Sequence, residues 1–155
     1  MSDVYQVGFE PGEIRTGEPT RSARLKWVIV VDEALPAGRA ANAAICVAAA
    51  TATSVTGLLG PDGKDAGGTI HPGLPWAGCT VLGAPADKLA AIRVKAAASI
   101  GVYVADMPAQ AQSTRVYDEY LSQLQDADAL TYHAISLVGP RNRIDKLVHR
   151  LPLLG

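Results

Sequence analysis

The feature that most constrains the fold is a short apolar run, LKWVIVV, at Leu25–Val31. It is too short for a helix, and its second half consists of β-branched side chains. An apolar run of this length without polar alternation is typical of a strand buried on both faces of a sheet. Helices must then cover both faces, so we expect an α/β protein with this run near the centre of its sheet.

Three further apolar segments follow, separated by helical patterns. We expect strands at residues 78–83, 102–107 and 131–139, and helices at residues 39–54, 85–100, 114–124 and 142–151. Pro85 suits the first position of a helix, and Gly101 suits the position after its last turn. The alternation of strand and helix predicts a sheet with helices on both faces and its first strands parallel, joined by right-handed crossovers.

The helix expected at residues 39–54 consists almost wholly of small side chains. Asn42, Thr51 and Thr53 are nearly its only polar residues. A helix that is apolar all round is a buried one, so we expect this helix to be enclosed. Its alanines would let it lie close to the sheet, and Pro36 and Gly38 would form the turn that precedes it.

Two segments show no periodic pattern. Residues 1–24 mix prolines, glycines and charges, and we expect an extended arm there, ahead of a single domain at residues 25–155. Residues 60–77 are dense in glycine and proline, which predicts a long loop of the kind that is usually functional or mobile. Three roles are open for Trp76 in this loop: lining a pocket, forming a dimer contact or covering an edge of the core.

The composition limits the classes of partner. The chain has 155 residues and a formal net charge of −1 at pH 7, which suits one domain and predicts no strong attraction to nucleic acid or to a membrane surface. Cys46 and Cys79 have apolar neighbours and form no C-x-x-C unit, so we expect two buried, reduced thiols. The N-terminal residues do not resemble a signal peptide, and the apolar stretch at residues 43–50 is far shorter than the ~20 residues of a membrane span. We therefore expect a cytoplasmic protein.

The segment KWVIVVDEALPAGRAANAAICVAAA resembles the opening of the type 2 peptidyl-tRNA hydrolases. That family has a strand, a loop of Met-Gly-Lys-Gly-Lys type and a helix with an Ala-Ala-Gln-Cys core, and Gly38, Ala43, Ala44 and Cys46 stand at matching places. The segment SLVGPRNRIDKLVHRL resembles the last strand, Gly-Pro turn and final helix of the same family. A bacterial family of unknown function with the same fold and N-terminal arm is closer still. The resemblance implies a three-layer α/β/α sandwich on a four-stranded mixed sheet whose last strand is antiparallel, and it implies a homodimer.

The resemblance also implies a site that differs from that of the hydrolases. The two loop lysines of the family fall on Arg39 and Ala41, and its aspartate falls near Ala109. Its threonine falls near Ser113 or Thr114. Asp106 takes the place of the aspartate only if the alignment is shifted.

The residues themselves suggest a ligand-binding group at the start of the first long helix. The free N–H groups of a helix N-terminus attract anions, and an arginine there can hold a phosphate or a carboxylate. Gly38, Arg39 and Asn42 are therefore candidate ligand-binding residues. The alternative is an ordinary solvated arginine.

Four further candidates follow strands. Asp32 and Asp106 lie where the first and third expected strands end, and ligands of open α/β sheets gather at the carboxyl ends of strands. Such a pair can bind a ligand or a metal, or serve as acid and base, and the alternative is capping of the strand ends. Ser113 and Thr114 could bond a substrate or cap a helix.

The remaining candidates are the three histidines and the C-terminal cations. His71, His133 and His149 lack metal-ligand spacing, and strict alternation places His133 on the strand face of Ile135 and Leu137, as a core or edge residue. The last expected helix is basic, which would suit an RNA backbone or a solvated helix face. Its cations are Arg141, Arg143, Lys146, His149 and Arg150.

Three functional hypotheses follow, none with a metal or a cofactor. The first is a domain that binds an anionic small molecule or an RNA end at a rim formed by Arg39, Asp106 and Ser113. The second is a hydrolase of an aminoacyl or peptidyl ester, such as peptidyl-tRNA, in which Asp106 positions water, Arg39 binds phosphate, and Ser113 or Thr114 holds the ester carbonyl. The third is a dimeric structural or interaction protein.

Overall fold

The computed structural model describes residues 6–155, so the first five residues of the expected arm lie outside the described part. Four strands form one sheet in the order β4–β1–β6–β5. They are β1 at Leu25–Asp32, β4 at Thr80–Ala84, β5 at Tyr103–Pro108 and β6 at Tyr132–Pro140. Strand β1 is parallel to β4 and antiparallel to β6, and β6 is also antiparallel to β5. The expected mixed sheet with an antiparallel last strand is therefore confirmed.

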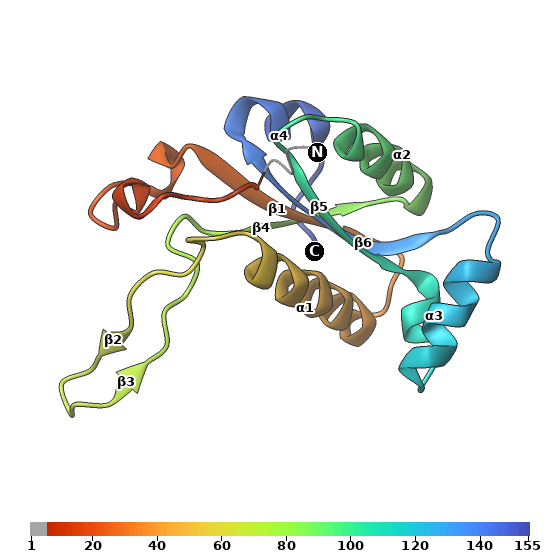
Figure 1. Cartoon of the computed structure of the whole chain (residues 1–155), viewed down its shortest axis with the longest axis horizontal. Coiled ribbons are helices and arrows are strands. Elements are labelled where there is room, and N and C mark those ends of the chain that lie inside the picture. The colour runs from red at the N-terminus through yellow and green to blue at the C-terminus, as the bar shows by residue number, and fades with distance from the viewer. Residues whose placement is uncertain (1–5) are drawn as a thin grey trace.

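Helices cover both faces of this sheet (Figure 1). Helix α1 (Ala37–Ser54) lies on one face, and α2 (Ala86–Ala97) and α4 (Arg141–Leu147) lie on the other. Helix α3 (Tyr117–Asp126) lies beside the edge strand β5 and follows a short 3-10 helix, η3, at Ala109–Gln112. The three-layer arrangement agrees with the sequence, although α4 ends four residues earlier than expected.

The core lies on both faces of β1. Trp27, Ile29 and Val31 belong to the cluster under α1, whereas Val28 and Val30 belong to the cluster under α2 and α4. All five side chains are buried. This alternation explains why the run at Leu25–Val31 has no polar face.

The expectation that α1 is enclosed is wrong. One stripe of the helix is buried against the sheet, and it consists of Ala40, Ala43, Val47 and Thr51. No element of the described chain covers the opposite side, where Ile45 is 66% exposed. Alanine fits a buried and an exposed helix position equally well, so the composition could not distinguish the two.

The prediction of buried thiols is also wrong. Cys46 lies on the outer part of α1, and Cys79 precedes β4; both are free and exposed. Ile45 and Val47 flank Cys46 in the sequence, but only Val47 belongs to the buried stripe of α1.

The two aperiodic segments take different forms. Arm residue Phe9 is buried, its N–H donates to the Thr56 carbonyl at 2.9 Å, and its ring lies 4.9 Å from that of Trp76. Trp76 therefore covers an edge of the core within its own chain. The other segment projects from the body as a hairpin of β2 (Gly63–Lys64) and β3 (Ile70–His71) (Figure 1).

Candidate functional site

A hollow opens where the chain leaves β5 and meets the start of α1. We call it the Arg39 hollow, and its volume is about 440 Å³. Helix η3, the first turn of α1 and the start of β6 form its walls. Its lining residues are Arg39, Ala109, Gln110, Gln112, Ser113 and His133.

A β-bulge brings His133 to this hollow. Tyr132 pairs with Pro108 and Ala134 pairs with Met107, so His133 is an extra residue in β6 without a partner in β5. A bulge of this kind re-aims a side chain and is common beside functional sites. His133 thus lies in the wall of the hollow, and not on the core face that strict alternation predicted for it.

The Gln112 side chain fixes the orientation of the His133 ring. Its Nε2 donates to the Arg39 carbonyl at 2.9 Å and to Asn42 Oδ1 at 3.1 Å. Its Oε1 must then accept, so the Nδ1 of His133, 2.6 Å away, carries the proton. In neutral His133 the other ring nitrogen, Nε2, is consequently an acceptor.

Arg39 is the cation of this hollow. Among the described residues its guanidinium forms no ion pair, and the residue is exposed. It is the third residue of α1, and no side chain caps the helix because the capping position holds Pro36. The first N–H groups of the helix therefore have no acceptor within the helix or from a capping side chain.

The hydroxyl groups of Ser113 and Thr114 have a local role. Both donate to the Gln110 carbonyl, each at 3.1 Å. They stabilise the end of η3, and they do not cap α3, which begins at Tyr117. Ser113 Oγ faces any ligand as an acceptor unless it turns away from Gln110.

Gln110 supplies an unusual feature of the same wall. Its side-chain Oε1 is shielded from solvent and has no hydrogen-bond partner in the part of the chain that the structure describes. Buried polar atoms without partners are rare in folded proteins. This oxygen is a polar group that a ligand donor or a small rearrangement could satisfy.

Asp106 lines a second hollow, between α1 and α3, which we call the α3 hollow. Its volume is about 530 Å³, and Asn42, Thr114, Tyr117 and Tyr120 also line it. Asp106 Oδ2 accepts from Arg93 Nε at 3.0 Å, so its charge is matched. Burial raises the pKa of Tyr120, with smaller effects from Tyr117 and Asp106, and keeps the phenol protonated.

The candidate site residues predicted from the sequence therefore do not form one site, because they lie in two different hollows or outside both. Arg39 and Ser113 line one hollow, whereas Asp106, Thr114 and Asn42 line the other. Asp32 lines neither, and its Oδ1 accepts from the Ala34 N–H at 3.0 Å, which ends β1. Gly38 lies in the first turn of α1 with open space around it.

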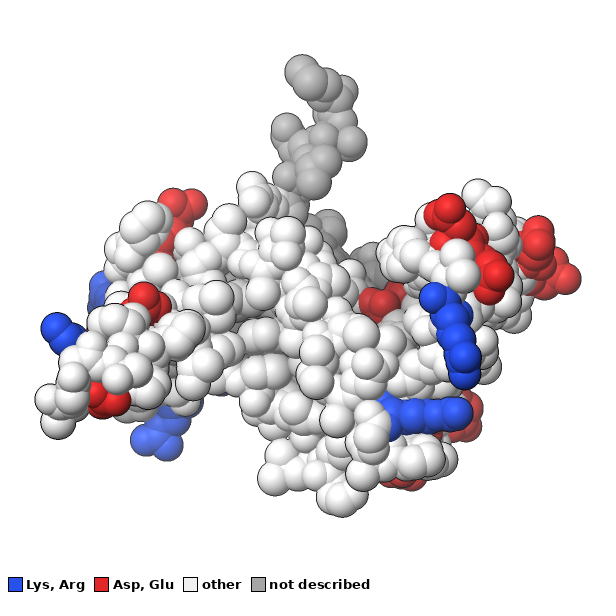
Figure 2. All heavy atoms as spheres, turned by 90° about the horizontal axis from the view of Figure 1, so that it is seen from below, with Lys and Arg blue, Asp and Glu red and all other residues white. Residues whose placement is uncertain are grey.

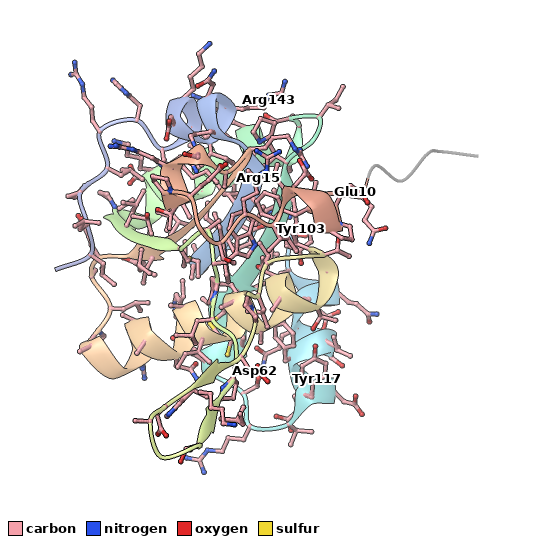
Figure 3. All side chains as sticks on the ribbon, turned by 90° about the vertical axis from the view of Figure 1, so that its left-hand side faces the viewer. Glu10, Arg15, Asp62, Tyr103, Tyr117 and Arg143 are labelled. Atoms are coloured by element: carbon pink, nitrogen blue, oxygen red, sulfur yellow. The ribbon has the colours of Figure 1, made fainter. Side chains whose placement is uncertain are left out.

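The basic C-terminal segment lies away from the Arg39 hollow. Arg141 donates to the Ala23 and Thr20 carbonyls, and Arg143 donates to the Ile100 carbonyl. Two of its cations are thus tied to the backbone. Helix α4 covers the face of the sheet opposite α1, and Arg143 lies at the other end of the view from Tyr117 (Figure 3).

A family model described as a protein of unknown function, DUF2000, matches residues 25–155. The chain belongs to the DUF2000 family. The match begins at Leu25, where β1 begins, so the DUF2000 region holds the whole sheet and both hollows. No curated protein matches the chain.

One similar solved structure is Atu0240, a protein of unknown function from Agrobacterium tumefaciens. It has a TM-score of 0.78 and 13% identity, over 85% of this chain and 98% of that one. At this identity the likeness shows the fold alone. The fold of the DUF2000 region thus recurs in a distant sequence.

Two kinds of feature are absent from the described residues, a membrane-spanning helix and a metal-ligand cluster. No helix among them is long and apolar enough to cross a membrane. No three His, Cys, Asp or Glu side chains of residues 6–155 gather as a metal site requires.

Proposed function

We propose that this DUF2000 protein binds a small molecule through an anionic group, a phosphate or a carboxylate, in the Arg39 hollow. The observation that carries the proposal is a cation, Arg39, without a counter-ion among residues 6–155, beside a helix N-terminus that no side chain caps. Arg39 supplies the charge, and it stands in the first turn of α1, the positive end of the helix dipole. The hollow of about 440 Å³ lies within the usual range for small-molecule sites.

His133 and Gln112 support the same ligand class. Because Gln112 holds Nδ1 of His133, a protonated His133 would donate from Nε2 to an anion. The bond from Gln112 to the Arg39 carbonyl fixes the start of α1 against η3. The backbone that carries Arg39 and the imidazole of His133 are therefore preorganised, which lowers the entropic cost of binding.

The geometry gives less support to ester hydrolysis. That hypothesis requires Asp106 to position water close to the group that Arg39 holds. Asp106 is instead paired with Arg93 and lines the α3 hollow. An RNA end as the ligand, a homodimer and a cytoplasmic location stay predictions.

The test is the response of the melting temperature to inorganic phosphate, followed by titration calorimetry. We expect phosphate to stabilise the parent chain and not Arg39→Gln. Arg115→Gln is the matched control, because it removes an equal charge from the wall of the α3 hollow. Equal responses of the parent and both variants would indicate a general salt effect and contradict the proposal.

A further inference from the structure

Helix α3 is not packed tightly onto the body of the molecule. None of its 10 residues is buried, although Tyr120 and Leu124 are half-buried. The α3 hollow, of about 530 Å³, lies between this helix and α1. Well-packed protein interiors leave few voids larger than a water molecule, so the loose docking of α3 marks a space that a ligand could fill.

The wall of the α3 hollow suits a flat aromatic ring. Tyr117 and Tyr120 both line the hollow, and their ring centroids lie 5.5 Å apart at an interplanar angle of 60°. A third ring can join such a pair edge to face. Met107 lines the same hollow, and thioether groups pack favourably against aromatic rings. Because Tyr117 is 74% exposed, a ligand ring would also cover apolar surface that the described chain leaves open.

Arg115 adds a cation to the wall of the α3 hollow. Its side chain is exposed and forms no ion pair with any described residue. A guanidinium group is attracted to the face of an aromatic ring but gains nothing comparable from a saturated one. This cation therefore favours an aromatic occupant over an aliphatic one.

Asp106 offers one carboxylate oxygen to an occupant of the α3 hollow. Its Oδ2 accepts from Arg93 Nε, and no described residue donates to its Oδ1. Since Arg93 already balances the charge, a neutral N–H or O–H donor fits this oxygen better than a second cation. The Asp106 side chain is only 22% exposed, and hydrogen bonds to charged acceptors are among the stronger ones.

The α3 hollow adjoins the Arg39 hollow. Gln112 lines the Arg39 hollow and Asn42 lines the α3 hollow, and Gln112 Nε2 donates to Asn42 Oδ1 at 3.1 Å. Ser113 and Thr114, neighbours in the chain, likewise line one hollow each. Arg39 and Asn42 stand three residues apart on α1, a spacing that separates Cβ atoms by roughly 5–6 Å. One small molecule can therefore reach both hollows.

The charges on this side of the molecule are mixed. Figure 2 looks onto the side that α1 and α3 form, and at the α3 end, on its right, Lys or Arg side chains lie beside Asp or Glu side chains. Asp118 and Glu119 are exposed in the first turn of α3. They would repel a polyanion, so the surface favours a small molecule with a single anionic group over a nucleic acid.

We propose that the α3 hollow binds the aromatic ring of the ligand whose anionic group the Arg39 hollow holds, an inference that rests on the proposed function. The ligand class is a small aromatic carboxylate or phosphate whose ring carries an N–H or O–H donor. The ring lies against Tyr117 and Tyr120, and its donor bonds Asp106 Oδ1. A short link past Asn42 joins the ring to the anionic group.

The first test measures dissociation constants by titration calorimetry. The carboxylate probes are indole-3-acetate, indole-3-propionate and indole-3-butyrate, whose link grows by one methylene at a time, and 3-indoxyl phosphate is the phosphate probe. We expect at least one of them to bind the parent at least about tenfold more tightly than the same anion without a ring, acetate or inorganic phosphate.

Two matched ligands separate the features of the ring. Cyclohexanepropionate has no aromatic ring, and 1-methylindole-3-propionate has no N–H, so both should bind more weakly than indole-3-propionate. Phosphate binding without any gain from an aromatic ring would overturn this inference and leave the proposed function standing. A parent that binds neither phosphate nor any probe would overturn both.

The second test locates the two parts of the tightest probe. Tyr117→Ala should weaken this probe about tenfold and change the affinity for inorganic phosphate less than about twofold. Leu121→Ala is the matched control, because it shortens an exposed apolar side chain on α3 that does not line the hollow. Equal affinities of these two variants for the probe would overturn the inference.

The anionic group is located by two arginine variants. Arg39→Gln should weaken the tightest probe and inorganic phosphate alike, whereas Arg115→Gln should weaken only the probe, by about two- to fivefold. Binding that depends on Arg115 but not on Arg39 would place the anionic group itself in the α3 hollow, and it would overturn the division of the ligand between the two hollows.

Discussion

At the scale of single residues, a buried chain of hydroxyl groups joins α1 to the sheet. Trp27 Nε1 donates to Ser136 Oγ at 2.8 Å, and Ser136 Oγ lies 2.7 Å from Thr51 Oγ1. Thr51 donates to the Val47 carbonyl, so Ser136 must donate to Thr51. Each donor in this series of hydrogen bonds has one acceptor, and the side chains of Thr51 and Ser136 are fully buried.

We expect Ser136→Ala to lower the free energy of unfolding by about 1–3 kcal/mol, because it leaves the indole N–H of Trp27 buried without an acceptor. The measurement is urea denaturation. Ser99→Ala is the control, since its hydroxyl donates to the Lys95 carbonyl at an exposed site and its loss should matter little. Equal effects of the two substitutions would show that the buried chain adds no stability.

Residue patterns predicted part of the candidate site. Arg39 and Ser113 were identified because a residue at a helix start and one after a strand can be located from the sequence. The place of His133 in the hollow was missed because the bulge at Tyr132–Ala134 reverses strict alternation. No residue type at these positions predicts a bulge. Gln112 was missed because its role depends on contacts with Arg39 and Asn42, about 70 residues away in the chain.

At the scale of elements, the first turn of α1 contains a glycine, Gly38, although neither its backbone conformation nor its surroundings require one. Gly38 is helical, and a Cβ there would meet nothing within 4 Å. We expect Gly38→Ala to raise the free energy of unfolding by about 0.4–1 kcal/mol, because alanine has fewer unfolded conformations to lose.

Gly57→Ala is the contrasting substitution. Gly57 has a φ of +74°, and a Cβ there would lie 2.8 Å from the Phe9 carbonyl oxygen. It should therefore destabilise the chain, with both variants followed by thermal and urea denaturation. Effects of the same sign would contradict this distinction.

The four strands could be predicted because a strand buried on both faces leaves a continuous apolar run, as at Leu25–Val31. The environment of α1 could not be predicted in the same way. Its buried stripe, Ala40, Ala43 and Val47, is no more apolar than its exposed Ile45 and Ala49. Which side faces the sheet is decided by tertiary packing and not by composition.

At the scale of the whole molecule, an ion pair ties the N-terminal arm back to its own last residue, Arg24, beside β1, and an apolar contact holds it to the body. Arg24 Nε lies 2.6 Å from Glu13 Oε1, and Arg24 also donates to the Gly8 carbonyl at 2.8 Å. Phe9 is buried beside Trp76. The hydrogen bond from Arg24, followed by the Glu10 N–H, lowers the pKa of Glu13 to about 2 from an ordinary value of 4.5.

This pKa makes the docking of the arm sensitive to acid. Because the pKa of Glu13 is lower in the folded state, its stabilising contribution is complete above pH 4.5 and is lost as the pH falls toward 2. We expect the protection factor of the Phe9 amide, which donates to Thr56, to fall across this range. Glu13→Gln should be less protected at pH 7 and show a flatter pH profile, whereas Glu18→Gln, which removes an exposed pair with Arg15, should follow the parent. An unchanged pH profile in Glu13→Gln would show that other carboxylates control the arm.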